Sequence, residues 1–342
     1  MSTQAVGVAH GRVNLIGEHT DYNDGFAMPT AIPQRATIRI GHSPDDANHV
    51  HSVILAGDAH FEMAAAPQIG FSSYVQGCIE VLRAAGYVLP PVSVEKDSDV
   101  PIGVGLSSSA ALEVATLRAL RTLFSLPIDD LELARFAQRA EIEYAGVRCG
   151  LLDQLACSLC APEQLLLLDM QSFTHRLLPM PPHTSVVVLD TGTSRSLAGS
   201  GYNQRRSECE EAARLLQVDS LRSVADLSAV GSLPDPLNRR VRHVVTENQR
   251  VLAAVSATAA QFGELMNASH LSLDVDYGVS TPALNTLVGC LRRLPGVLGA
   301  RLTGAGFGGA CVELVEAGCE DRIRVGALQS YAEAGYSGKA LV

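Results

Sequence analysis

The segment that most constrains this chain lies at residues 101–110, where PIGVGLSSSA separates a strand-like stretch from a helical one. PVSVE before it is typical of a strand, and Val114, Leu117, Leu120 and Phe124 after it recur at the three- and four-residue steps of a helix. Glycines let the backbone turn tightly, and a helix N-terminus capped by serines is a ready site for anions. The segment therefore predicts a strand, a loop and a helix, and it predicts that the loop binds a phosphate group.

An ordinary strand-to-helix turn is the alternative, and a G-x-G pattern alone would favour it. The hydroxyls of Ser107, Ser108 and Ser109 favour a phosphate or its magnesium ion, because both accept hydroxyl groups as partners. The loop lacks the lysine of a Walker loop, and Ser108 stands where a dinucleotide-binding loop has its third glycine. The glycines in residues 304–309 fit the dinucleotide pattern, but the strand-like ACVELVE follows them, so they predict a turn between strands.

A second polar segment lies near the N-terminus, in GRVNLIGEHTDYN at residues 11–23. Its carboxylate, imidazole and amide groups suit a polyhydroxylated ligand, because such groups pair with sugar hydroxyls. A solvated loop after an N-terminal strand is the alternative. His49 and His51 form a separate pair, which we assign to an exposed hairpin rather than to a metal site.

The length of 342 residues and the hydrophobic content of 47% predict about two domains, each with a core of its own. The prolines of MPPHTS at 180–185 predict a boundary that gives domains 1–180 and 181–342. Helical and strand patterns alternate in both halves, which predicts two α+β domains with the active site between them. The patterns predict early antiparallel strands at 36–40 and 51–55, and helices at 72–85, 129–144, 205–216 and 241–262.

The charge and the cysteines exclude several classes of protein. A formal net charge of −10 argues against a nucleic-acid-binding surface, and Lys96 and Lys339 are the only lysines, so a phosphate site must use arginine, backbone amides or a metal. The N-terminal MSTQAVGVAH lacks the apolar region typical of a signal peptide, and the sequence has no apolar run of ~18 residues, so we expect a cytoplasmic protein without a membrane partner. Cys157 and Cys160 form a lone C-x-x-C, which predicts buried, reduced thiols.

Seven segments, in order along the chain, resemble the galactokinases of the GHMP small-molecule kinase family. GRVNLIGEHTDYNDG at 11–25 is similar to the galactokinase signature, PIGVGLSSSAALEVA at 101–115 to the ATP loop, and LTGAGFGGACVEL at 302–314 to the third motif. The likeness spans nearly the whole chain. The other four segments are CGLLDQ at 149–154, SGYNQRR at 200–206, HVVTENQRV at 243–251 and FGELMNASHLSL at 262–273.

The resemblance implies a two-domain GHMP kinase fold, with an N-terminal domain of the S5-domain-2-like type and a ferredoxin-like α+β C-terminal domain. It also implies a monomer that uses ATP and Mg²⁺ to phosphorylate the C1 hydroxyl of a sugar. Asp153 would be the catalytic carboxylate facing that hydroxyl, with Arg12 beside it. Whether Asp153 is a base or an orienting group is open, and an aspartate that only caps a helix is the alternative.

The resemblance further implies three groups of binding residues. The magnesium ion would be held by Ser108 and Glu141, although Glu143 is as good a candidate by composition. Phe71 stands where a tryptophan near the adenine is usual, and its flat ring still permits stacking. The sugar contacts would be Glu18, His19, Asp21, Gly150 and Tyr202, and the nucleotide contacts would be Phe71, Gly103, Gly105, Leu106, Ser107, Ser108, Ser109 and Ala110.

Departures from the family pattern concern the choice of sugar. His10, Ile142 and Asn285 replace a proline, a histidine and an aspartate that are common at these positions. Galactose is the expected substrate, and arabinose, N-acetylgalactosamine or a uronic acid is the alternative. A sensor that binds sugar and ATP without turnover is a second alternative, which the intact run of serines at 107–109 disfavours.

Overall fold

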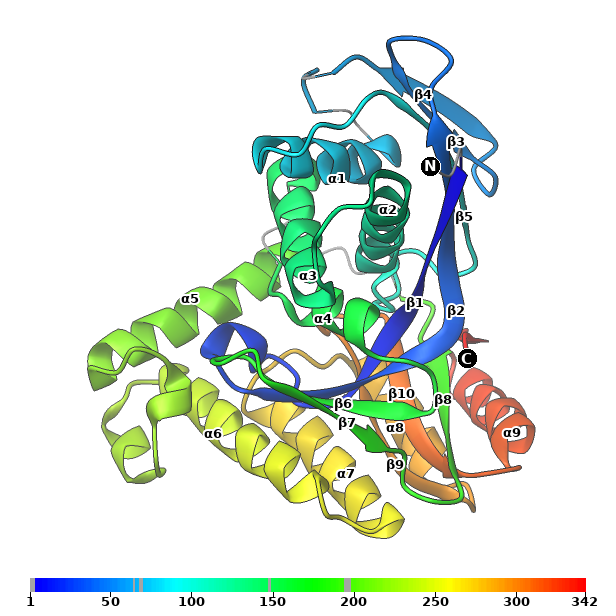
Figure 1. Cartoon of the computed structure of the whole chain (residues 1–342). Coiled ribbons are helices and arrows are strands. Elements are labelled where there is room, and N and C mark those ends of the chain that lie inside the picture. Colours follow the sequence, from blue (N-terminus) through cyan, green and yellow to red (C-terminus); the bar gives the residue numbers. More distant parts are fainter. Residues whose placement is uncertain (1–3, 64, 68–69, 147–148, 194–197) are drawn as a thin grey trace. The chain divides into compact units, whose positions relative to one another are not determined.

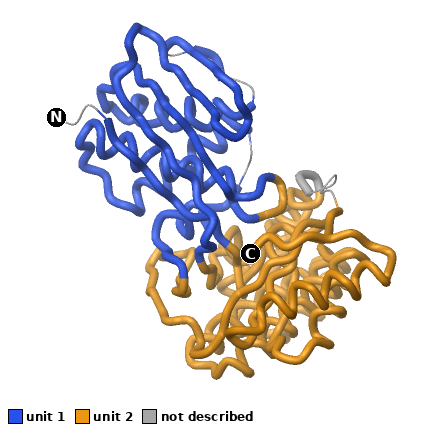
Figure 2. Tube along the Cα trace, turned by 90° about the vertical axis from the view of Figure 1, so that its right-hand side faces the viewer, with its two compact units in different colours: residues 1–12, 31–102, 106–162 blue, residues 13–30, 103–105, 163–342 orange. Residues whose placement is uncertain are grey.

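The computed structural model describes residues 4–63, 65–67, 70–146, 149–193 and 198–342. Two compact units divide the chain (Figure 2). Unit 1 comprises residues 1–12, 31–102 and 106–162, and unit 2 comprises residues 13–30, 103–105 and 163–342. The units therefore interleave along the chain, and a single boundary at 180/181 stays a prediction.

Unit 1 packs a sheet against a group of helices, which Figure 1 shows on one face of the sheet. The strand order is β4-β3-β5-β2. The early strands were expected to be antiparallel, but β3 and β5 run parallel, with His49 opposite Ser93. The strand expected at 51–55 ends at Ser52, after which the chain turns into β4. The bounds are β2 (Phe26–His42), β3 (Asn48–Ser52), β4 (Gly57–Phe61) and β5 (Val92–Ser98).

The helices of unit 1 largely follow their sequence patterns. The helix expected at 129–144 begins with a capping box between Asp129 and Glu132, but its α-helical part ends at Ala140, where a π turn (Glu141–Ala145) follows. Val75 and Ile79 of α1 and Leu117 of α2 are buried, as their spacing predicts. The helices are α1 (Ser72–Ala84), α2 (Ser108–Phe124), α3 (Asp130–Ala140) and α4 (Leu152–Leu159).

Cys157 and Cys160 of unit 1 are buried thiols, as their sequence context predicts. Burial raises the pKa of the Cys160 thiol to about 11. Since a neutral thiol is a poor nucleophile and metal ligand, the pair fits the expected role in packing.

Two long strands contribute to both units. Strand β1 (Gln4–Ile16) carries Arg12 at the end of unit 1 and continues into unit 2. In unit 2, the first residues of β2 pair antiparallel with β6 (Gln164–Asp169), which pairs in turn with β7 (His175–Pro179). The polar segment at 11–23 is therefore divided along the chain, with residues 11–12 in unit 1 and residues 13–23 in unit 2.

Unit 2 is built on an antiparallel sheet in the order β11-β8-β10-β9. Val187, Leu189 and Leu302 are fully buried in its core. The glycine-rich residues 303–309 connect β9 and β10, which confirms a turn between strands. The strands are β8 (Thr184–Asp190), β9 (Val297–Leu302), β10 (Ala310–Glu316) and β11 (Lys339–Ala340).

The prediction of one helix over residues 241–262 is wrong, because two helices share this stretch. The first ends at Ala254, and the second begins after Thr258, whose side chain forms a capping box with Gln261. The helices are α5 (Ala198–Leu216), α6 (Leu237–Ala254), α7 (Ala259–Val275), α8 (Pro282–Arg292) and α9 (Glu320–Glu333), with short turns η1 (Asp21–Asn23), η3 (Leu221–Ser223) and η4 (Ser228–Ser232).

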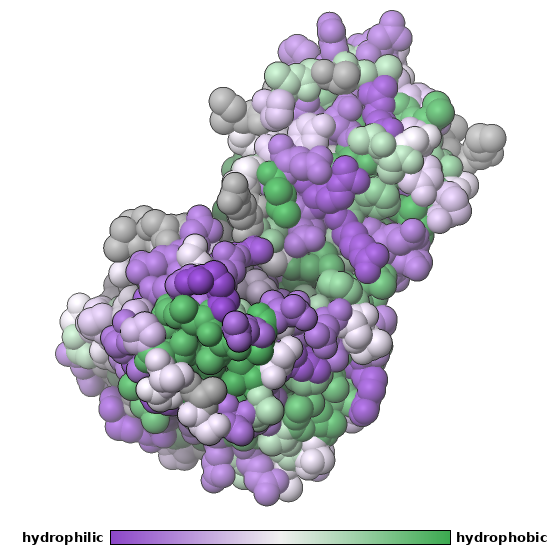
Figure 3. Space-filling view, turned by 90° about the vertical axis from the view of Figure 1, so that its left-hand side faces the viewer, coloured by the Kyte–Doolittle hydropathy of each residue, from purple (hydrophilic) through white to green (hydrophobic). Residues whose placement is uncertain are grey.

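Both units mix sheets with helices, which confirms the α+β class. None of the helices in the described part of the chain combines the length and apolar character needed to cross a membrane. On the face drawn in Figure 3, hydrophilic side chains cover most of the surface, and hydrophobic ones gather in smaller patches.

Candidate active site

Unit 1 brings Arg12, Ser107 and Asp153 together, although Arg12 and Asp153 are 141 residues apart in the sequence. The Arg12 guanidinium donates two hydrogen bonds to Asp153 Oδ1, from Nε at 3.0 Å and from Nη2 at 2.5 Å. The hydroxyl of Ser107 donates to Asp153 Oδ2 at 2.7 Å. The Arg12 side chain is 5% exposed and that of Asp153 is 35% exposed, so a buried cation holds a carboxylate that still reaches the surface.

The local backbone explains how these side chains meet. The Arg12 N–H donates to the carbonyl of Leu106 at 3.2 Å, which fastens β1 to the loop before α2. A Cβ atom at Gly11 would lie 2.8 Å from that carbonyl oxygen, so only glycine permits this approach. Asp153 lies in the first turn of α4, where it makes no capping bond. The alternative of a helix-capping aspartate therefore does not fit.

The serine loop differs from its prediction in one respect. Ser107 occupies the N-cap position of α2 in a left-handed conformation, with φ at 57°, and its side chain does not cap the helix. The expected serine cap is wrong here because the hydroxyl is engaged by Asp153. Ser107 therefore does not cap the backbone N–H groups in the first turn of α2. An anion site at this helix end would need these N–H groups as donors.

A group of buried polar side chains lies between α2, the π turn and α4. Ser109 Oγ donates to Glu141 Oε1 at 2.8 Å, and the Gln154 amide donates to Glu141 Oε2 at 2.6 Å and to Glu113 Oε2 at 3.4 Å. Ser109 is thus the serine that contacts Glu141, and the metal-binding role predicted for Ser108 stays a prediction. Glu143, the alternative to Glu141, is half-exposed and pairs with Arg139.

This group suits a hard cation. Burial raises the pKa of Glu141 despite its hydrogen bonds, and burial together with neighbouring Glu141 raises that of Glu113. Among the described residues, Glu113 Oε1 and Gln154 Oε1 have no hydrogen-bond partner. In the described ranges no three His, Cys, Asp or Glu side chains converge as metal ligands. Mg²⁺ does not need such a cage, because it takes one or two protein oxygens together with phosphate oxygens and waters.

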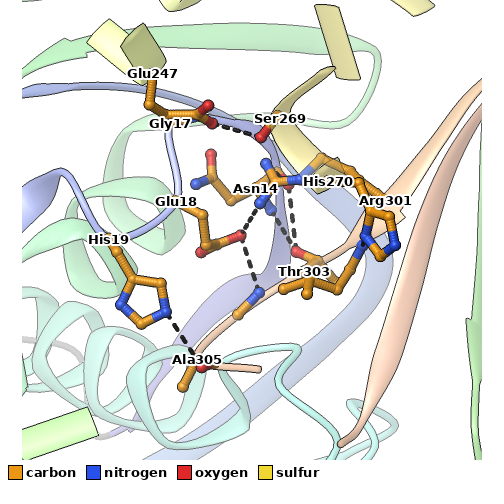
Figure 4. A network of polar contacts seen from close by, with 12 residues as sticks. Asn14, Gly17, Glu18, His19, Glu247, Ser269, His270, Arg301, Thr303 and Ala305 are labelled. Carbon is orange, nitrogen blue, oxygen red and sulfur yellow. Dashed lines mark hydrogen bonds and ion pairs between the residues drawn. The ribbon is translucent and has the colours of Figure 1, made fainter. Parts of the chain in front are cut away.

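In unit 2, Glu18 is anchored deep in the protein (Figure 4). Its Oε2 accepts a hydrogen bond from Arg301 Nη2 at 2.7 Å and one from the Gly304 N–H at 3.0 Å. The Arg301 side chain is fully buried. Glu18 therefore fixes the glycine turn after β9, and the sugar contact expected of it stays a prediction.

Both ring nitrogens of His19 have protein partners in unit 2. Nε2 lies 3.2 Å from the carbonyl oxygen of Ala305 and so carries the proton (Figure 4), which leaves Nδ1 to accept from the Tyr22 hydroxyl at 2.8 Å. Burial is the main cause that lowers the pKa of His19 to about 3, so the ring is neutral. The sugar contact predicted for His19 stays a prediction.

The other predicted sugar contacts of unit 2 lie in the same region. The Tyr202 ring lies 5.7 Å from that of His19 and 5.3 Å from that of Tyr22, between ring centroids. Asp21 is the first residue of turn η1 and is half-buried. Unit 2 thus brings together Tyr202 with residues of the polar segment that lie far from it in the sequence.

The remaining predicted residues are distributed over both units. In unit 1, Gly150 precedes α4, Leu106 and Ala110 are fully buried, and Phe71 is half-buried at the start of α1. In unit 2, Gly103 and Gly105 adopt positive φ angles of 78° and 89°, as a tight loop requires.

Sequence reasoning missed three residues that contact the predicted ones. Glu113 and Gln154 bracket Glu141, and Arg301 holds Glu18. Glu113 offered a signal, because it is a charged residue within the otherwise apolar run of α2. Arg301 offered none, since its partner lies 283 residues away.

Three family descriptions match the chain. "Galactokinase galactose-binding signature" matches residues 2–42, "GHMP kinases N terminal domain" matches 73–160, and "GHMP kinases C terminal" matches 252–332. These ranges contain Arg12, the serine loop, Asp153 and the glycine turn.

Known proteins resemble the chain over most of its length. The galactokinase of Roseiflexus sp. (strain RS-1) is 43% identical over an alignment 344 positions long, which covers 95% of this chain and 87% of the relative. That of Mycobacterium tuberculosis (strain ATCC 25618 / H37Rv) is 44% identical over 92% of this chain and 89% of the relative. The crystal structure of Lactococcus lactis galactokinase complexed with galactose matches with a TM-score of 0.92 at 33% identity, covering 98% of this chain and 92% of that one.

The fold is shared more widely. The crystal structure of Methanococcus jannaschii mevalonate kinase matches with a TM-score of 0.73 at 18% identity, over 99% of this chain and 98% of that one. Such low identity shows a common fold alone, whereas the relatives above share sequence over nearly their whole length. The chain belongs to the galactokinases of the GHMP kinase family.

Proposed function

We propose that this chain transfers the γ-phosphoryl group of ATP to the C1 hydroxyl of galactose, giving galactose 1-phosphate and ADP. The observation that carries the proposal is the carboxylate of Asp153, held by Arg12 and Ser107 at the surface of unit 1. The galactokinase relatives and the complex of the Lactococcus lactis enzyme with galactose support this choice of sugar.

Phosphoryl transfer needs an oriented nucleophile and stabilised charge more than a covalent intermediate. Asp153 Oδ1 accepts two hydrogen bonds from Arg12, while among the described residues Oδ2 accepts one, from the Ser107 hydroxyl. A carboxylate oxygen can accept a second hydrogen bond, so Oδ2 is the atom that would orient the sugar hydroxyl and receive its proton. Arg12 would help to neutralise the transferring group.

Glu141 and Ser109 would hold the Mg²⁺ that travels with ATP, with Ser108 as a further candidate. The ion would supply positive charge between the phosphate groups. The residues fit it because their donors are hard oxygens and because Glu141 has no arginine partner among the described residues. Gln154 donates to both Glu141 and Glu113, so we assign it the orientation of Glu141.

Glu18, His19, Asp21 and Tyr202, which all belong to unit 2, would select the sugar. A buried polar site built around hydroxyl groups rejects ligands that lack them, because its own groups are then left unpaired. Phosphorylation of arabinose, N-acetylgalactosamine or a uronic acid is the alternative. A sensor without turnover is disfavoured, since the contacts of the serine loop to Asp153 and Glu141 are intact.

A panel of free sugars with ATP and Mg²⁺, scored for sugar 1-phosphate, tests the proposal. We expect galactose to give the highest kcat/KM, and Asp153→Asn to lower its kcat by about 10²–10³-fold. Faster turnover of another sugar in the panel would overturn the substrate. Binding of ATP and sugar without release of ADP, unchanged by Asp153→Asn, would establish the sensor instead.

A further inference from the structure

Lys96 is a buried cation in unit 1, and one of only two lysines in the chain. It lies on β5, and the residue is 8% exposed. Its Nζ lies over the ring of Phe71, 5.1 Å from the ring centroid. The other lysine, Lys339, is exposed at its side chain and lies 3.8 Å from a carboxylate oxygen of Asp190.

No carboxylate in the described part of the chain forms an ion pair with Lys96. Its strand neighbours on the same face of the sheet are Ile38 of β2 and Ser52 of β3, and neither carries a charge. Burial lowers the pKa of the Lys96 ammonium, and no neighbouring acid opposes this effect. The π face of Phe71 is the one described group that offsets the charge, and it does so weakly.

A buried ammonium without an acid destabilises the folded protein, so its presence needs an explanation. A ligand that offers acceptor atoms would supply the missing partner. The neighbouring Phe71 adds a flat apolar surface, on which a planar ring can stack. A flat heteroaromatic ring with acceptor nitrogens at its edge matches both features, and a purine base is such a ring.

The position of Lys96 along the chain agrees with a nucleotide. Strand β5 ends at Ser98 and leads directly into the loop 101–107 and helix α2. The phosphate groups of ATP are expected at that loop, so the base of the same nucleotide can reach residues earlier on the strand. A charged donor at the base would strengthen nucleotide binding without touching the reacting atoms.

We propose that Lys96 is a nucleotide-binding residue, whose ammonium donates a hydrogen bond to an acceptor nitrogen of the adenine base beside Phe71. The proposal rests on the proposed function for the identity of the nucleotide. It assigns Lys96 to the base, whereas Arg12 and Glu141 are assigned to the phosphoryl group and its metal ion.

Acetylation of the two lysines tests the proposal, because each serves as the other's reference. The protein is treated with an amine-acetylating reagent, and the rate at each lysine is followed by mass spectrometry of peptides. We expect saturating ADP to slow acetylation of Lys96 about ten-fold or more and to leave Lys339 unchanged. Galactose or inorganic pyrophosphate alone should protect neither. Equal protection of Lys96 by pyrophosphate, or none by ADP, would overturn the assignment.

Lys96→Met, with Lys339→Met as the matched control, tests the same contact by affinity. We expect Lys96→Met to raise the Kd for ADP and the KM for ATP by about ten-fold, with the Kd for pyrophosphate, the KM for galactose and kcat at saturating ATP unchanged. The melting temperature without ligand should not fall, because a buried unpaired charge is removed. A lower melting temperature, with ADP and pyrophosphate weakened alike, would show a structural role and contradict the proposal.

Deaza analogues identify the acceptor. Among ATP analogues that lack N1, N3 or N7, one should lose as much affinity as Lys96→Met does, with no further loss in the variant. Additive losses for all three would contradict a direct contact. If the protein binds ADP and ADP protects Lys96 but no sugar is phosphorylated, the proposed function fails alone. If galactose is phosphorylated and ADP leaves Lys96 unprotected, the Lys96 proposal fails alone.

Discussion

Two buried carboxylates in each unit have different kinds of partner. In unit 2, Glu18 pairs with the buried Arg301 at 2.7 Å, and Glu247 pairs with Arg250 at 2.6 Å. In unit 1, Glu113 and Glu141 share the amide of one glutamine, and no arginine of the described residues pairs with either. Arginines of the chain neutralise the charges of Glu18 and Glu247. The charges of Glu113 and Glu141 can be neutralised by a proton or by a bound cation.

The pKa values follow this difference. Burial alone would raise the pKa of Glu247, but the charges of Arg250, His243 and Arg301 bring it down to about 2. Glu141 has no such neighbours, and burial raises its pKa. A carboxylate in low dielectric must be paired or neutralised. The contrast therefore separates a structural network from the group that we propose as the metal site.

Asp153→Asn should give the largest effect and should leave stability nearly unchanged. The variant removes the charge that Arg12 holds at the surface, so we expect kcat to fall by about 10²–10³-fold. Because the side chain is 35% exposed, the melting temperature should change little. Steady-state kinetics and thermal unfolding check both, with Asp321→Asn on the surface as the control. A large loss of stability would mean that Asp153 is structural like Glu18.

Glu18→Gln should lower the free energy of unfolding, which Asp153→Asn should leave nearly unchanged, whether or not it also weakens sugar binding. It leaves the fully buried Arg301 without its counter-charge, and breaking a buried pair costs about 3–5 kcal/mol. Denaturant unfolding measures the loss. Glu143→Gln, which breaks the half-exposed pair with Arg139, is the matched control and should cost less than about 1 kcal/mol. Equal effects of the two variants would contradict the assignment of Glu18 to a structural network.

Glu141→Gln should alter the response to Mg²⁺ rather than the fold. Removing one ligand should raise the Mg²⁺ concentration for half-maximal activity by about 10–100-fold, while the ligand-free protein stays as stable as before. Titration of activity against Mg²⁺ at fixed ATP measures this shift, and Glu143→Gln is again the control. If Glu143→Gln shifts the titration and Glu141→Gln does not, the two glutamates exchange roles.

Glu313 of β10 is an exception in unit 2, because both its carboxylate oxygens are buried and neither has a hydrogen-bond partner among the described residues. Burial raises its pKa well above 4.5. Below pH 4.5 both the folded and the unfolded chain hold the proton; above it the unfolded chain loses the proton first, so stability falls as the pH rises. We expect Glu313→Leu to raise the free energy of unfolding by about 1–2 kcal/mol at pH 8 and to show no gain near pH 4.

Unfolding at a series of pH values measures this gain, with the exposed Glu316→Gln as the control. A gain that is the same at pH 4 and pH 8 would show that packing, and not the proton, is responsible.

Local patterns in the sequence predicted what local forces decide. The loop that begins at residue 101 depends on its glycines, and the helices α1 and α2 depend on the spacing of apolar residues. The sequence placed all three correctly. The contacts of Glu18 and His19 were not predictable, because Arg301 and the carbonyl of Ala305 come from a strand and turn near the other end of the chain. Proximity in the folded chain, and not residue type, decides those partners.

The parallel pairing of β3 with β5 and the division of 237–275 into two helices were missed for related reasons. Parallel strands need a long connection, which β4 and α1 form here. The residues of β3 and β5 give no indication that the two strands pair across this connection. The start of α7 depends on the capping box between Thr258 and Gln261, a short signal within a continuous apolar periodicity.

The product formed from galactose, ATP and Mg²⁺ tests the central claim most directly. Phosphorus-31 NMR of the reaction should show one sugar phosphate, in which the phosphorus couples to the hydrogen on C1, formed together with an equal amount of ADP. The Asp153→Asn variant should give none in the same time. Phosphate attached to another carbon, or no sugar phosphate from the intact protein, would contradict the account.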